Sequence, residues 1–95
     1  MAKAMSDINK VLEYLESRRA EWDDLLCQYL RIPSVSADPN HAEDVREAAR
    51  WTAGLFDRMG FSVELVDGEH RPIVHAQSPR VEGAPTVLVY GHYDV

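Results

Sequence analysis

The stretch "NHAEDVREAARWTAGLFDRMGFSVELVD", residues 40 to 67, contains two hydrophobic periods in succession. Up to residue 59 the apolar positions recur every three or four residues, which predicts one face of an amphipathic helix. Together with Thr52, the apolar residues Val45, Ala48, Ala49, Leu55, Phe56 and Met59 form this face. From Phe61 onward apolar and polar residues alternate, which is typical of a half-buried strand. The change of period therefore predicts a helix followed directly by a strand.

Both ends of this helix carry sequence signals. Asn40 stands where an N-cap is expected, and Glu43 follows three residues later, so the pair predicts a capping box. Gly60 follows the last apolar position and predicts the C-terminal stop. These signals bound the helix at about residues 41 to 59.

Two further strands are predicted downstream of the first. Residues 67 to 72, "DGEHRP", read as a turn, and "IVHAQ", residues 73 to 77, as the antiparallel partner of the first strand. Residues 86 to 91, "TVLVYG", lack any alternation and predict a third strand buried on both faces.

Upstream, helical spacing is present between residues 6 and 31. The apolar positions are Ile8, Val11, Leu12, Leu15, Trp22, Leu25, Leu26, Tyr29 and Leu30. The segment "ESRRAE" between the two groups is either a polar turn of helix or a break, and Pro33 places the end near Arg31. Cys27 lies in the apolar stripe, so a small buried hydrophobe is its expected role. The order of two helices followed by three strands predicts the opening of an α/β structure with a mixed sheet.

Composition excludes several classes of function. The 95 residues carry a net charge of -6, with no cluster of positive charge for nucleic acid or an anionic membrane surface. No stretch approaches the roughly 20 apolar residues that span a bilayer. Cys27 is the only cysteine, which rules out an internal disulfide. The first ten residues have no apolar core of a signal peptide, so a cytoplasmic protein is expected.

The sequence "GHYDV", residues 91 to 95, carries the candidate chemistry. In an extended segment His92 and Asp94 point to the same side, so the carboxylate lies beside the imidazole. It could hold one ring nitrogen while the other binds a metal ion. The alternative is a polar strand end whose side chains only satisfy nearby backbone groups.

Three motifs together resemble a known family. "LRIPSVSADPNHAEDVREAARW", "MGF" and "GHYDV" occur in the order seen in dinuclear zinc metallopeptidases, a family that includes carnosinases, aminoacylases, acetylornithine deacetylase and the glutamate carboxypeptidases. "GHYDV" resembles the dipeptidase and carnosinase branch in particular. The resemblance implies that residues 1 to 95 are the N-terminal portion of the catalytic domain. The rest of that domain, and a lid domain that mediates homodimerisation, would lie outside these residues.

The same resemblance implies roles for the two candidate residues. His92 would be a terminal ligand of one of two zinc ions, or of another divalent metal, and Asp94 would steady this histidine without ligating. The implied reaction is hydrolysis of an amide bond in a small peptide or N-acyl amino acid by a metal-activated water. Catalytic zinc normally takes three protein ligands, so the 95-residue chain alone is expected to be inactive.

Two alternatives use the same sequence differently. A strand followed by a His-Gly loop supplies an oxyanion N–H in serine hydrolases, but here Gly91 precedes His92, and no Gly-x-Ser-x-Gly elbow is present. A non-catalytic interaction module would use the amphipathic helix of residues 6 to 31 to bind a partner protein.

Overall fold

The structure is a computed structural model that describes residues 2–68 and 71–95, with side chains from residue 7 onward. The chain divides into two compact units, Met1–Arg31 and Ile32–Val95. No helix in the described ranges is both long enough and apolar enough to cross a membrane.

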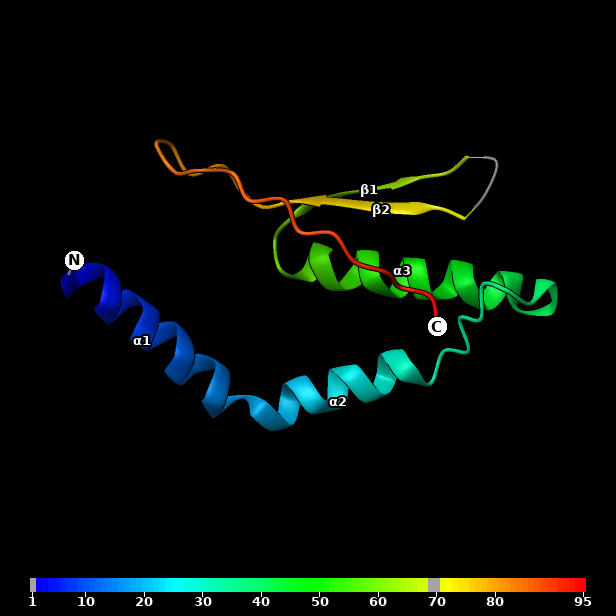
Figure 1. Cartoon of the computed structure of the whole chain (residues 1–95), viewed down its shortest axis with the longest axis horizontal. Coiled ribbons are helices and arrows are strands. Elements are labelled where there is room, and N and C mark those ends of the chain that lie inside the picture. The colour runs from blue at the N-terminus through cyan, green and yellow to red at the C-terminus, as the bar shows by residue number, and fades with distance from the viewer. Residues whose placement is uncertain (1, 69–70) are drawn as a thin grey trace. The chain divides into compact units, whose positions relative to one another are not determined.

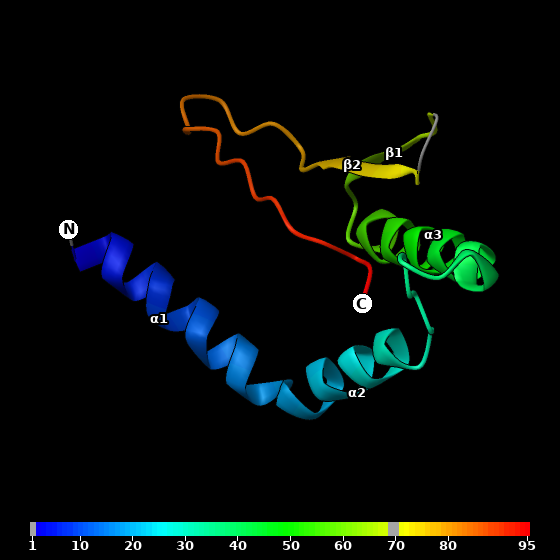
Figure 2. The ribbon, with the colours of Figure 1, turned by 45° about the vertical axis from the view of Figure 1, so that its right-hand side comes forward.

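The first unit consists of helices α1, Ala2–Ser17, and α2, Arg19–Leu30. The sequence alone does not decide whether residues 16 to 21 form a turn of helix or a break. The structure has a break at Arg18, whose φ of -116° and ψ of 21° lie outside the helical region. The chain changes direction between the two helices there (Figure 2). The indole Nε1 of Trp22 donates to the carbonyl of Leu15 across the break, at 3.0 Å. The guanidinium of Arg18, the residue at the break, lies 5.9 Å from the centroid of the Trp22 ring, a cation–π contact.

One prediction for this unit is wrong. Cys27 is exposed rather than buried, as are its apolar neighbours Leu26 and Leu30. The periodicity of the stripe marks a face that can be buried, but α2 contains no buried residue.

The second unit begins with a loop and a short 3-10 helix, η1, Pro39–His41, followed by α3, Ala42–Arg58. The predicted capping box is wrong. Asp38 caps η1 by accepting a hydrogen bond from the backbone N–H of Asn40 at 2.9 Å, and His41 is the N-cap residue of α3 without a side-chain cap. Because Pro39 starts a helical turn with its fixed φ, Asn40 already lies inside that turn. The predicted stop is confirmed by Gly60, whose φ is +86°.

One face of α3 provides most of the core. Val45, Ala48 and Ala49 are fully buried, and Ser34 and Ile32 from the preceding loop are buried as well. At the other end, Met59, the C-cap residue of α3, is 57% exposed. The buried side chains concentrate in the N-terminal half of the helix.

The predicted antiparallel pair is confirmed. Strand β1, Ser62–Val66, pairs with β2, Ile73–Gln77, in a register that sets Ser62 opposite Gln77. Helix α3 lies along this hairpin and contacts both strands (Figure 1). The turn predicted over residues 67 to 72 includes residues 69 and 70, which lie outside the described part of the chain.

The third predicted strand is wrong. The sheet has two strands, and residues 84 to 95 form neither helix nor strand, so the predicted mixed sheet of three strands is not observed. The side chains expected to be covered on both faces, Val87 to Tyr90, are 78 to 92% exposed. Apolar sequence predicts burial, but a strand also needs a hydrogen-bonded neighbour. Within residues 2–68 and 71–95 no segment provides that neighbour. Helices with an antiparallel pair remain consistent with the α/β class.

Candidate functional site

The "GHYDV" segment is held by the loop that precedes η1 rather than by the sheet. The backbone N–H of Val95 donates to the carbonyl of Ser34 at 2.8 Å. The Ser34 hydroxyl donates in turn to the carbonyl of Tyr93 at 3.1 Å, and Ser34 is fully buried. These two bonds fix the backbone on which His92 and Asp94 stand.

The Tyr93 side chain provides a third attachment. Its hydroxyl donates to the carbonyl of Pro72, just before β2, at 2.6 Å. Partial burial raises the pKa of the Tyr93 phenol above its usual 10.0, and the Asp94 carboxylate raises this pKa further. The segment is thus tied both to the loop around Ser34 and to the start of β2.

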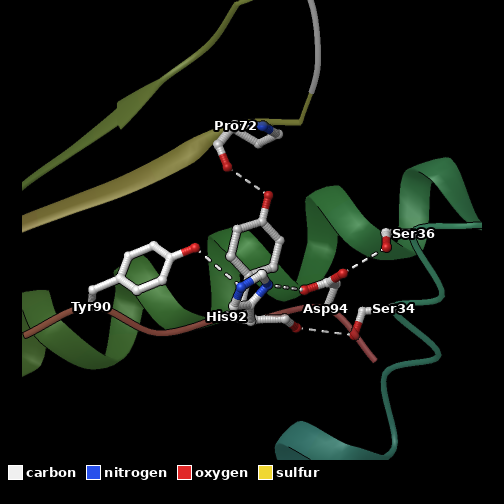
Figure 3. Close-up of polar contacts among 7 residues, drawn as sticks. Ser34, Ser36, Pro72, Tyr90, His92 and Asp94 are labelled. Atoms are coloured by element: carbon white, nitrogen blue, oxygen red, sulfur yellow. Dashed lines mark hydrogen bonds and ion pairs between the residues drawn. The ribbon is translucent and has the colours of Figure 1, made fainter.

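His92 and Asp94 are in contact, as extended backbone predicts. The Nδ1 atom of His92 lies 3.1 Å from Oδ1 of Asp94, and Nε2 lies 3.1 Å from the hydroxyl of Tyr90 (Figure 3). An ionised carboxylate can only accept, so Nδ1 carries a proton, and in the neutral imidazole Nε2 then keeps its lone pair. That lone pair faces the Tyr90 hydroxyl. The His92 side chain is 69% exposed.

The other carboxylate oxygen of Asp94 has its own partner. Ser36 donates from Oγ to Oδ2 at 2.6 Å (Figure 3). The bond from Ser36 lowers the pKa of Asp94 below its usual range, and the bond from His92 lowers it further. Asp94 is therefore held in the ionised form that the contact with His92 requires.

The other described histidines do not share this arrangement. His41 pairs locally with Asp44, Nδ1 to Oδ2 at 2.8 Å, at the start of α3. His75 stands opposite Glu64 in the hairpin and is exposed. Sequence analysis did not identify Ser34, Ser36 or Tyr93 as part of the site. The only sequence signal for the two serines is that both lie in the motif "LRIPSVSADPNHAEDVREAARW".

The contacts of His92 fit the role of one ligand of a metal centre. Catalytic zinc takes three protein ligands, and the imidazole of His92, oriented through Nδ1 by a carboxylate, has the usual form of one of them. In the described residues no group of three or more His, Cys, Asp or Glu side chains gathers to complete such a centre.

A first prediction concerns Tyr93 and stability at high pH. Replacing Tyr93 with Phe removes the bond to Pro72, at a cost of about 1 kcal/mol in unfolding free energy near neutral pH. A pKa raised by folding means that the protonated phenol stabilises the fold below about pH 10, and that this contribution is lost as pH rises through the raised pKa. Denaturant titrations between about pH 8 and 11 should show the wild type losing more stability than Tyr93→Phe. Parallel losses in both proteins would contradict the role of this hydroxyl.

Comparison with known proteins finds similarity to two dipeptidases. The chain is 32% identical over 98 residues to the Cys-Gly metallodipeptidase of Schizosaccharomyces pombe, a match that covers 93% of this chain and 21% of the relative. It is 35% identical over 78 residues to the cysteinylglycine-S-conjugate dipeptidase of Corynebacterium striatum, covering 79% of this chain and 16% of that protein. No protein-family model matches the chain, and no solved structure does.

Both relatives are named as dipeptidases, and the first of them as a metallodipeptidase. The chain spans about a fifth of the length of the curated relatives that it matches. The name of the first relative also implies a metal cofactor for that protein.

Proposed function

We propose that residues 1 to 95 are the N-terminal portion of the catalytic domain of a longer metallodipeptidase, called the full-length protein below. The similarity to two dipeptidases, extending over 93% of the chain in one case, supports the reaction class. The observation that carries the proposal is the His92–Asp94 pair, in which a carboxylate holds Nδ1 and leaves Nε2 with its lone pair.

His92 would then be one ligand of a metal centre, and Asp94 would orient it. A divalent metal at this centre, zinc in our proposal, would polarise the scissile carbonyl and lower the pKa of a bound water. Within this chain, Asp94 keeps the proton on Nδ1, and the bonds of Ser34 and Tyr93 hold the backbone that carries both residues. The remaining ligands and a general base would come from outside residues 1 to 95.

The substrate class follows from the names of the relatives. We propose dipeptides with a free amino terminus, and cysteinylglycine is the first to test, since both relatives are named for that unit. N-acyl amino acids are the second candidates, because the wider family suggested by the motifs includes aminoacylases.

The test is hydrolysis by the purified full-length protein. We expect release of free amino acids from cysteinylglycine, loss of this activity after dialysis against a chelator, and recovery when Zn²⁺, Mn²⁺ or Co²⁺ is added back. A serine hydrolase would instead survive chelation and be inactivated by a phosphonofluoridate. That pattern, or the absence of any dipeptide hydrolysis, would overturn the proposal.

A further inference from the structure

The two carboxylate oxygens of Asp94 have different partners. Oδ1 lies 3.1 Å from Nδ1 of His92, and Oδ2 accepts from the hydroxyl of Ser36 at 2.6 Å. The shorter contact has the length expected of a charge-assisted O–H···O⁻ bond. Ser36 therefore makes the tighter of the two polar contacts on this carboxylate, although it does not touch the histidine.

A carboxylate held at one oxygen is free to turn. The terminal torsion of an Asp side chain is broad and roughly two-fold, so a single bond to His92 leaves the carboxylate plane poorly fixed. A second bond at the opposite oxygen removes this freedom. Because the Asp94 side chain is only 32% exposed, water competes for Oδ2 less than it would at an open surface.

The position of Ser36 is set independently of Asp94. It lies between Ser34, which is fully buried and bonded to the backbone of Tyr93, and Asp38, which caps η1. Backbone bonds from Asp38 to Val35 at 3.2 Å and from Val35 to Pro33 at 2.8 Å close the loop on itself. The Ser36 hydroxyl is thus presented by a loop that its own backbone hydrogen bonds hold in place.

We propose that Ser36 is a positioning residue that orients the Asp94 carboxylate and through it the His92 imidazole, so that Nε2 is presented as the ligating nitrogen. The metal-binding consequence rests on the function proposed above. The orientation of the imidazole, by contrast, depends only on residues of this chain and can be measured without metal.

Three variants of the full-length protein separate the possible roles of the loop. Ser36→Ala removes the hydroxyl, and Ser36→Thr keeps it. Ser34→Ala is the matched control, because it removes a neighbouring hydroxyl that bonds the Tyr93 carbonyl and not the carboxylate. Two readouts are used: Zn²⁺ affinity by competition with a chromophoric chelator, and the ring ¹⁵N shifts of His92 in metal-free protein. The shifts are recorded at about pH 8.5, where an ordinary imidazole is neutral.

We expect Ser36→Ala to lower Zn²⁺ affinity about 10-fold. Loss of a residue that hydrogen-bonds a metal ligand costs about 10–100-fold in affinity, and Ser36 acts on the ligand only through Asp94, so the lower end applies. In metal-free protein its His92 Nδ1 and Nε2 shifts should move toward each other, because both tautomers become populated. Ser36→Thr should restore both readouts. Ser34→Ala should keep the separated shifts of the wild type, even if it melts at a lower temperature.

Two results would overturn the positioning role. One is that Ser36→Ala keeps the wild-type ¹⁵N shifts of His92. The other is that Ser34→Ala changes these shifts as much as Ser36→Ala does, which would mean that the loop acts only by holding the backbone of residues 93 to 95. Failure of the proposed function has a different signature: the shifts respond to Ser36→Ala as expected, while His92→Ala leaves Zn²⁺ affinity unchanged. The two proposals can therefore fail separately.

Discussion

His92→Ala in the full-length protein is expected to reduce dipeptide hydrolysis to background and to weaken the binding of one metal ion. The substitution removes the only imidazole in the described residues whose Nδ1 is held by Asp94 and whose Nε2 keeps a lone pair on an exposed ring. A catalytic metal with three protein ligands cannot lose one without a large loss of affinity. Metal content after gel filtration and the rate of cysteinylglycine hydrolysis are the measurements.

Asp94→Asn should behave differently, because this residue acts through the histidine. The amide can still accept from Nδ1–H, but without the negative charge that raises the basicity of the ligating nitrogen. We expect activity to fall about 10–100-fold and to recover in part when Zn²⁺ is raised. A titration of Zn²⁺ against hydrolysis rate distinguishes this partial, rescuable loss from the loss caused by His92→Ala.

The chain offers a matched control for both variants. His41 is also paired with a carboxylate, Asp44, at 2.8 Å, but it stands at the start of α3. His41→Ala should therefore keep wild-type metal content and turnover. If His92→Ala were as active as His41→Ala, both residues would merely satisfy local polar groups, and the ligand role would be wrong.

Val45→Asp is expected to unfold the second unit. Val45 is fully buried on the face of α3 that also carries Ala48 and Ala49. A carboxylate there would have neither water nor a positive partner, and an unpaired buried charge costs several kcal/mol. That is comparable to the whole stability of a small domain, which is about 5–15 kcal/mol. Circular dichroism should show loss of helix at room temperature, or the variant should be recovered only as insoluble protein.

Two further substitutions calibrate this effect. Val45→Ala removes two methyl groups from the same site and should lower the unfolding free energy by about 2 kcal/mol while preserving the fold. Glu47→Ala, at an exposed position on the same helix, should change it by less than about 0.5 kcal/mol. A cooperative melt of Val45→Asp at the wild-type temperature would show that this face of α3 is not the core.

The sequence predicted the elements that local patterns specify. The period of α3 and the alternation in β1 are properties of neighbouring residues, so the helix, the hairpin and its antiparallel sense were all predicted. β2 has the predicted bounds, residues 73 to 77. The capping box failed because two local signals competed, and Pro39 with Asp38 determined the start of η1 in place of Asn40. Residues 86 to 91 failed because a strand is defined by its partner, and periodicity carries no information about partners.

In the candidate site, too, the contact between residues close in sequence was predicted and the contact between distant residues was not. The contact between His92 and Asp94 follows from extended backbone alone, since side chains two residues apart share a face. The bond from Ser36 joins residues 58 positions apart, and nothing in the local sequence around either residue indicates it. The metal-ligand and orienting roles of His92 and Asp94 stay predictions for the experiments above.

The distance along the chain between the loop and "GHYDV" has a consequence for the order of folding. The bonds of Ser36 to Asp94 and of Ser34 to Tyr93 close segments of 58 and 59 positions, whereas α3 and its hairpin form from contacts close in sequence. Closing a long loop has an entropic cost that local structure must first offset, so such contacts tend to form late. We therefore expect residues 93 to 95 to dock after the rate-limiting step. Weakening this docking would then speed local release of the histidine and leave the folding rate of α3 almost unchanged.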